Sequence, residues 1–83
     1  MELKDTVDMM LSSDYRERFR AEYLQTKIRK DKLDRVIREA GKLDFKLDCT
    51  INTLRKQRNI MKQYLGILRA RAETEGIDLD DDL

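Results

Sequence analysis

Two tyrosines and two lysines share one predicted helix at spacings that bring them to neighbouring positions. Tyr15 and Tyr23 are eight residues apart, so both fall on one side of an α-helix, and Lys27 and Lys30 follow Tyr23 within two turns. An aromatic ring gives a nucleobase a face to stack on, and a lysine ammonium neutralises a phosphate. We take these four side chains as candidate ligand-binding residues. The alternative is that the tyrosines border the core while the lysines extend to solvent.

The apolar side of the same helix is interrupted by polar residues. At 100° per residue, Thr26 and Lys30 fall in the stripe that carries its large apolar side chains. In an antiparallel hairpin, Gln57 and Arg58 of the next helix converge on them and bring no counter-charge. A buried lysine without a partner is costly, so either the helices splay there or an anion completes the site. Thr26, Gln57 and Arg58 therefore join the ligand-binding candidates.

The residue types that catalysis requires are absent. The chain has no histidine and one cysteine, Cys49, which excludes His-based catalysis, most zinc sites and an intramolecular disulfide. No glycine-rich phosphate loop occurs. Asp31 and Asp34 alternate with basic residues, which indicates surface ion pairs. We expect a binding protein with no catalytic residue, no metal site and no cofactor.

The net charge of +1 conceals a strong asymmetry. Residues 1–14 carry one lysine and four acids (−3), residues 15–72 carry 17 basic and seven acidic residues (+10), and residues 73–83 carry six acids (−6). A basic central region favours an anionic partner. A solvated surface of lysine and arginine is the alternative explanation.

Composition and periodicity predict an all-α protein. Charged residues make up 42% of the chain and hydrophobic residues 40%, with no proline. The two longer helices should form an antiparallel αα-hairpin. The predicted segments are a short helix over 2–11, a helix over 15–40, a connection over 41–48, a helix over 49–75 and a flexible acidic tail over 76–83.

Capping residues define the predicted helix ends. Asp14 begins the second helix, and Asp48 or Thr50 begins the third. Gly41 and Gly76 supply the left-handed residue that ends each one. The tail beyond Gly76 is expected to fray.

Both long helices carry more apolar surface than one partner helix covers. Leu24 and Ile28 lie almost opposite the main stripe of the second helix, and Ile60, Tyr64 and Ile67 flank the stripe of the third. Because so short a chain has a small core, we expect these five residues to form a homo-oligomer interface. Isolated surface apolar residues are the alternative. Whether the first helix packs on its own hairpin or on a second copy stays open.

The sequence contains neither a membrane-spanning run nor the pattern of a signal peptide, and both bear on where we expect the protein. No apolar run is long enough to span a bilayer, and the start MELKDTVDMML is acidic where a signal peptide is basic. We expect a cytoplasmic protein without a membrane partner.

Three motifs carry a resemblance to a known family. They are F-x-A-E-Y-x-x-x-K-I-R over 19–29, GKLDF over 41–45 and Q-x-x-x-M-x-x-Y-x-x-x-L over 57–68. With them, residues 14–79 resemble small helical accessory proteins of tailed phages, including crAss-like phages. Thr50 stands where such relatives often have proline, a departure that concerns helix capping more than binding.

The expected architecture is also similar to that of the phage anti-CBASS and anti-Thoeris sponges, which assemble as oligomers and sequester signalling nucleotides. This likeness implies a phage counter-defence protein in the cytoplasm of the infected bacterium. It would bind an anionic nucleotide of the cyclic oligonucleotide type without catalysis. Two alternatives stay open: a protein-protein inhibitor of a host defence enzyme such as a CRISPR nuclease, and a nucleic-acid-binding or structural phage protein.

Overall fold

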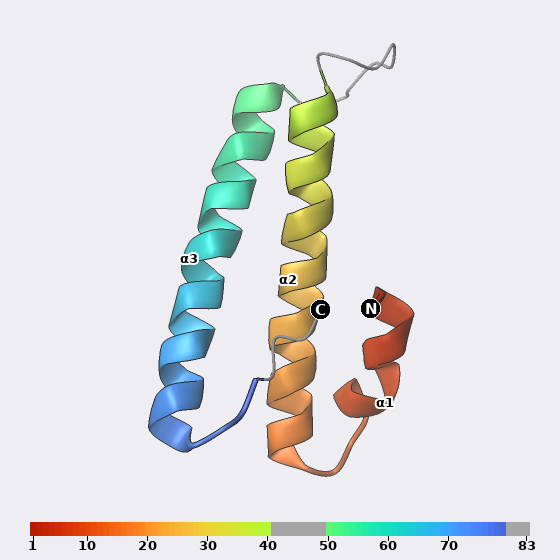
Figure 1. Cartoon of the computed structure of the whole chain (residues 1–83), viewed down its shortest axis with the longest axis vertical. Coiled ribbons are helices and arrows are strands. Elements are labelled where there is room, and N and C mark those ends of the chain that lie inside the picture. The colour runs from red at the N-terminus through yellow and green to blue at the C-terminus, as the bar shows by residue number, and fades with distance from the viewer. Residues whose placement is uncertain (41–49, 80–83) are drawn as a thin grey trace.

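Two helices of 25 residues lie side by side and antiparallel (Figure 1). The computed structural model describes residues 1–40 and 50–79. The elements in chain order are the 3-10 helix η1 (Leu3–Thr6), α1 (Val7–Met10), α2 (Tyr15–Glu39) and α3 (Ile51–Glu75). These described residues contain no strand, so the prediction of an all-α fold is confirmed.

The ends of the long helices follow from local capping chemistry. The Asp14 carboxylate accepts a hydrogen bond from the backbone N–H of Arg16 at 2.9 Å, so α2 begins at Tyr15. The Thr50 hydroxyl accepts one from the N–H of Thr53 at 3.2 Å at the start of α3. Gly76 ends α3 with φ of 69°, a left-handed conformation that glycine adopts without strain. The predicted connection over 41–48, with its stop at residue 41, lies outside the described residues.

The core occupies the half of the hairpin that holds the first turns of α2 and the last turns of α3. Tyr23 and Leu68 are fully buried at its centre. In the other half, Leu33, Ile37 and Leu54 are only half-buried. The cluster of buried side chains consists of Phe19, Tyr23, Leu24, Leu65, Leu68, Ala72 and Ile77.

The residues after α3 fold back onto the hairpin. The backbone N–H of Ile77 donates to the carbonyl of Ala72 at 2.8 Å, and the Ile77 side chain is 8% exposed within the core cluster. Leu79 packs against the same cluster. The prediction of a fraying tail from residue 76 is therefore wrong for 77–79, because two apolar side chains anchor this segment.

The N-terminal segment packs on its own hairpin, on the side of α2 opposite α3 (Figure 1). Thr6 is fully buried, and its hydroxyl accepts a hydrogen bond from the Gln25 amide at 2.8 Å. Met9 packs against the core cluster, to which Leu24 belongs. Leu24 and Ile28 are 3% and 7% exposed, so the prediction that they lie at an oligomer interface is wrong for a chain that covers them itself.

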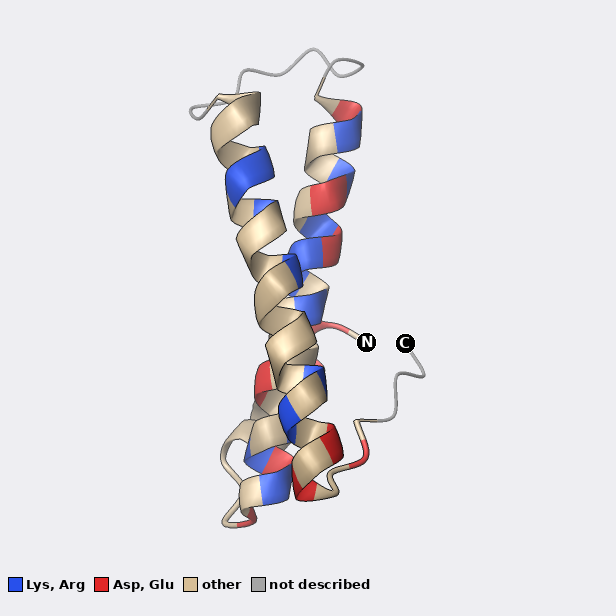
Figure 2. Ribbon diagram, turned by 90° about the vertical axis from the view of Figure 1, so that its left-hand side faces the viewer, with Lys and Arg blue, Asp and Glu red and all other residues tan. Residues whose placement is uncertain are grey.

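Charge is distributed differently on the two long helices. Figure 2 shows acidic and basic residues alternating along the upper part of α2, whereas the side of α3 turned away from α2 is largely uncharged. Within residues 1–40 and 50–79, no helix has the apolar length that crossing a bilayer requires.

Candidate functional site

Tyr23 is a core residue and offers no surface for stacking. Its side chain is 0% exposed, and its hydroxyl accepts a hydrogen bond from Arg69 Nε at 2.9 Å. The Arg69 guanidinium also lies 5.4 Å from the centre of the ring, at cation-π distance. The prediction that Tyr23 stacks on a base is wrong, because both faces of the ring are covered by the hairpin.

Tyr15 is exposed but lies far from the predicted lysines. Its hydroxyl donates to Glu75 Oε1 and accepts from Arg71 Nη2, each at 2.9 Å, which fastens the first turn of α2 to the last turn of α3. Lys30 follows fifteen residues later, roughly 22 Å along the helix axis. The structure therefore does not bring Tyr15 and Lys30 into one site.

Lys30 has counter-charges on its own helix. Its ammonium lies 3.0 Å from Asp34 Oδ2 and 3.1 Å from Asp31 Oδ1. The other oxygen of Asp34 accepts a hydrogen bond from Arg58 Nη1 at 2.9 Å, so one carboxylate joins α2 to α3. The prediction that Lys30 needs splayed helices or an anion for want of a counter-charge is wrong, whereas the predicted ion pairing of Asp31 and Asp34 with neighbouring basic residues is confirmed.

The other polar interruption of the stripe is satisfied in the same local way. The Thr26 hydroxyl donates to the carbonyl of Glu22 at 2.9 Å, one turn earlier in α2. Lys27 is half-buried, and Gln57 is exposed. Gln57, one of the predicted ligand-binding residues, lies in an open groove that is described below.

The bridge between Lys30, Asp34 and Arg58 shifts two pKa values. Burial by itself raises the pKa of Asp34, but hydrogen bonds from Arg58 and Lys30 outweigh it and leave this pKa below 3.8. The hydrogen bond to Asp34 raises the pKa of Lys30 above 10.5, an effect that burial only partly offsets and Asp31 reinforces. Asp34 thus stabilises the fold above its unfolded-state pKa, and this contribution is lost as the pH falls through the folded-state pKa. Lys30 contributes below 10.5 and loses its effect as the pH rises through its raised pKa.

Replacing the bridging carboxylate should weaken the hairpin at neutral pH. We expect Asp34→Asn to lower the free energy of unfolding by about 1–2 kcal/mol, because two charge-assisted hydrogen bonds are lost at a partly exposed site. Since the folded-state pKa of Asp34 is lowered, the difference from the unmodified chain should hold down to about pH 4 and shrink below it. Urea unfolding at several pH values measures both effects.

Asp31→Asn is the matched control for this experiment. Its side chain is 57% exposed and contacts Lys30 alone in this network. Its loss should therefore cost no more than about 0.5 kcal/mol. Equal losses for the two variants at neutral pH would show that the link from Asp34 to Arg58 does not hold the helices together.

A groove between α2 and α3 opens in the half of the hairpin away from the core cluster. Its volume is about 330 Å³. The lining residues are Arg29, Lys32, Leu33, Val36, Gln57 and Met61, and we call this the cationic groove. Arg29, Leu33 and Val36 recur at i, i+4 and i+7, which is why they follow one side of α2. The bridge residues Lys30 and Asp34 lie on another side.

The cationic groove combines two kinds of contact that an anion with an aromatic part requires. Arg29 and Lys32 are exposed and can hold phosphate oxygens by charge-assisted hydrogen bonds. The apolar side chains of Leu33, Val36 and Met61 line the same space. No acidic residue is among its lining residues, so nothing in the groove itself repels an anion.

Two other cavities between described residues are less suited to an anion. One, of about 310 Å³, is lined by Arg16 and Arg20 but also by Asp14, Glu17 and Asp78. Arg20 Nε is buried there without a hydrogen-bond partner. The other, of about 230 Å³, includes Asp31 among its lining residues. Carboxylates at both cavities oppose the approach of a phosphate.

Sequence reasoning missed most of the cationic groove. The signal was present in the spacing of Arg29 and Lys32 next to Leu33 and Val36, which places two cations beside an apolar strip of one helix. That spacing alone does not single out a site, because the charged residues of α2 recur on several sides. Gln57 and Met61 of α3 form the other side of the open groove.

The Sequestin family model matches residues 13–74, three quarters of the chain. The chain belongs to the Sequestin family. No curated protein and no solved structure matches it. The Sequestin match covers α2 and all of α3 except its last residue, and it includes every residue that lines the cationic groove.

The family name indicates a protein that sequesters a ligand, which fits binding rather than turnover. Among the described residues of this Sequestin-family chain, no three His, Cys, Asp or Glu side chains are grouped so that they could hold a metal ion.

Proposed function

We propose that this Sequestin-family chain sequesters an anionic signalling nucleotide of the cyclic oligonucleotide type and does not alter it. The observation that carries the proposal is the cationic groove, where Arg29 and Lys32 stand beside apolar side chains with no acid in the lining. The family name and the lack of histidine support binding without catalysis.

Each lining residue has a role that its chemistry suits. The Arg29 guanidinium and the Lys32 ammonium bind phosphate oxygens, and the planar guanidinium also stacks on a base. Leu33, Val36 and Met61 exclude water from one face of the base. The amide of Gln57 donates to and accepts from the polar edge of the base. Neither phosphate hydrolysis nor base transfer has a nucleophile or general base at this site.

Sequestration has a simple biological use. A signal that activates a host defence enzyme loses its effect when a binding protein lowers its free concentration below the dissociation constant of that enzyme. We propose that the chain acts in this way as a phage counter-defence protein in the cytoplasm of an infected bacterium, against pathways of the CBASS or Thoeris type.

The test is a calorimetric titration of the full chain with a panel of cyclic dinucleotides and cyclic trinucleotides. We expect heat of binding for at least one member, together with a rise in melting temperature. At a free ligand concentration of 100 times the dissociation constant, binding stabilises the fold by about 2.7 kcal/mol. A panel that produces neither heat nor stabilisation would overturn the proposal.

A second measurement separates sequestration from cleavage. The complex is heated until the protein unfolds, and the released ligand is identified by chromatography. Sequestration predicts intact ligand in full yield. Recovery of a linear or otherwise altered nucleotide would show instead that the chain is an enzyme.

A single-stranded DNA oligonucleotide serves as the comparison ligand. A nucleic-acid-binding protein would bind it at least as tightly as the cyclic nucleotides, and its affinity would fall steeply with salt because several phosphate contacts release counterions. The cationic groove has two basic residues, so we expect weaker binding of the oligonucleotide.

A further inference from the structure

A second cavity borders the cationic groove along α2, next to the N-terminal segment. Its volume is about 230 Å³, and Figure 1 shows the N-terminus beside the middle of α2. The lining residues are Met1, Ile28, Asp31, Lys32 and Arg35, and we call this the Asp31 cavity. Lys32 also lines the cationic groove, so the two cavities share one ammonium group. A phosphate bound to Lys32 therefore has a cavity on each side of it.

The polar groups of the Asp31 cavity are an acceptor and a donor one helical turn apart. Asp31 and Arg35 stand at i and i+4, the spacing at which opposite charges pair on a helix. They do not pair: Asp31 Oδ1 lies 3.1 Å from the Lys30 ammonium, and Arg35 has no ion-pair partner among residues 1–40 and 50–79. An ionised carboxylate accepts several hydrogen bonds and a guanidinium donates several. Both groups therefore retain capacity for a ligand.

We propose that the Asp31 cavity is a guanine subsite and that the ligand is a cyclic dinucleotide with at least one guanine. The Asp31 carboxylate accepts hydrogen bonds from the N1–H and the 2-amino group of guanine, two parallel donors that match its two oxygens. Arg35 donates to O6 and N7 of the same base, the commonest specific contact between arginine and guanine. All four groups lie along one continuous edge of guanine, so residues one helical turn apart reach them together. The identity of the ligand rests on the proposed function.

The other bases do not offer the donors that Asp31 requires. Guanine is the one common base with two adjacent N–H donors on its pairing edge. Adenine presents the lone pair of N1 where guanine has an N–H, so a carboxylate repels it. Uracil has one N–H between two carbonyl oxygens, and these oppose the charge of Asp31. A site that leaves a charged acceptor unpaired with the wrong base discriminates against that base.

The apolar part of the Asp31 cavity suits a flat ring. Ile28 is 7% exposed and lies at the bottom of the cavity, and Met1 lines it from the N-terminal segment. A methionine thioether makes favourable contacts with aromatic rings. A cyclic dinucleotide then places one base here, the other base against Leu33 in the cationic groove, and a phosphate on Lys32 between them.

Calorimetric titration with three cyclic dinucleotides tests the guanine subsite. The ligands are cyclic di-GMP, cyclic di-AMP and cyclic di-IMP, whose hypoxanthine keeps N1–H, O6 and N7 but lacks the 2-amino group. We expect cyclic di-GMP to bind at least about tenfold more tightly than cyclic di-AMP, with cyclic di-IMP between them. If cyclic di-AMP binds as tightly as cyclic di-GMP, the guanine subsite is refuted and the proposed function stands.

Asp31→Asn tests which residue distinguishes the bases. The change turns one acceptor into a donor, so the affinity for cyclic di-GMP should fall about tenfold. The affinity for cyclic di-AMP should stay the same or rise, because the repulsive carboxylate is gone. Asp8→Asn is the matched control, since it removes the same charge from an exposed position of α1 that lines neither cavity. A preference for cyclic di-GMP that persists in Asp31→Asn would overturn the inference.

Titration with GMP and AMP covers the case in which no cyclic nucleotide binds. The proposed function then fails. A preference for GMP that Asp31→Asn abolishes and Asp8→Asn retains would still support the guanine subsite. Absence of heat with both mononucleotides would refute the guanine subsite as well.

Discussion

Leu68→Ala is expected to lower the free energy of unfolding by about 3 kcal/mol, within the range of roughly 2–5 kcal/mol that large-to-small core changes cost. Leu68 is 0% exposed and lies at the centre of the core cluster beside Tyr23. The loss combines the transfer free energy of the removed carbons with the cost of the cavity they leave. Urea unfolding followed by circular dichroism measures it.

The size of this effect matters because the chain is small. At roughly 0.05–0.15 kcal/mol per residue, a chain of this length has a total stability of about 4–12 kcal/mol, so one leucine supports a large share of it. In the half of the hairpin that holds the cationic groove, the described apolar residues Leu33, Val36, Ile37, Leu54 and Met61 are half-buried and offer little to compensate.

Leu11→Ala is the matched control for Leu68→Ala. The same side-chain atoms are removed, but Leu11 is 74% exposed, so the change should stay within about 0.5 kcal/mol. Comparable losses for the two variants would mean that the cluster around Leu68 does not carry the stability of the hairpin.

Features that depend on neighbouring residues could be predicted from the sequence. Asp14, Thr50 and Gly76 cap the helices where their side chain or backbone chemistry requires. The all-α fold follows from periodicity, and Arg58 bonds Asp34, one turn along α2 from Lys30, on which the antiparallel hairpin was predicted to bring Arg58. Local chemistry and a short connection are enough to set these features.

The counter-charge of Lys30 was within reach of the same local reasoning. Asp34 stands one turn further along α2, at the spacing where ion pairs form on a helix. The prediction considered only acids of the facing helix and so missed it. Lys30, the lysine in the apolar stripe, is therefore part of the bridge that Asp34 forms between α2 and α3.

Features that depend on the path of the whole chain could not be predicted in this way. From the sequence, Leu24 and Ile28 resemble an exposed face of the helix, but the N-terminal segment covers them in the structure. Ile77 likewise stands in a polar tail of the sequence, but its side chain is buried in the core cluster. The apolar stripe of α2 does not predict which of its tyrosines is buried in the core cluster. Tyr23 is buried because Arg69 and the core cluster surround it, and no local pattern encodes that.

Reversing the charge of the cationic groove is expected to change the free energy of binding about as much as Leu68→Ala changes the free energy of unfolding. The double variant Arg29→Glu, Lys32→Glu should lower nucleotide affinity by at least about 100-fold, the equivalent of about 2.7 kcal/mol, because two attractive contacts become repulsive in the same space. Both side chains are exposed, so the change should leave the helical content and the melting temperature of the unliganded protein nearly unaltered.

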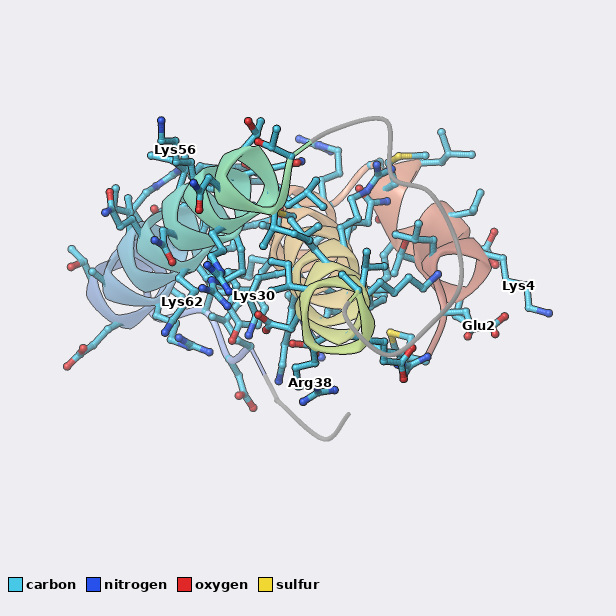
Figure 3. The ribbon with its side chains drawn as sticks, turned by 90° about the horizontal axis from the view of Figure 1, so that it is seen from above. Glu2, Lys4, Lys30, Arg38, Lys56 and Lys62 are labelled. Carbon is cyan, nitrogen blue, oxygen red and sulfur yellow. The ribbon has the colours of Figure 1, made fainter. Side chains whose placement is uncertain are left out.

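The double variant Arg38→Glu, Lys62→Glu makes the same change in net charge elsewhere. Figure 3 shows Arg38 and Lys62 on the side of the hairpin that carries Lys30, and neither lines the cationic groove. If long-range attraction by the basic region held the nucleotide, both double variants would lose affinity equally. Added salt would then abolish the difference in affinity between each variant and the unmodified chain. A loss confined to the first variant means that direct contacts from Arg29 and Lys32 hold the nucleotide, since only contact at short range depends on which side of the hairpin carries the charge.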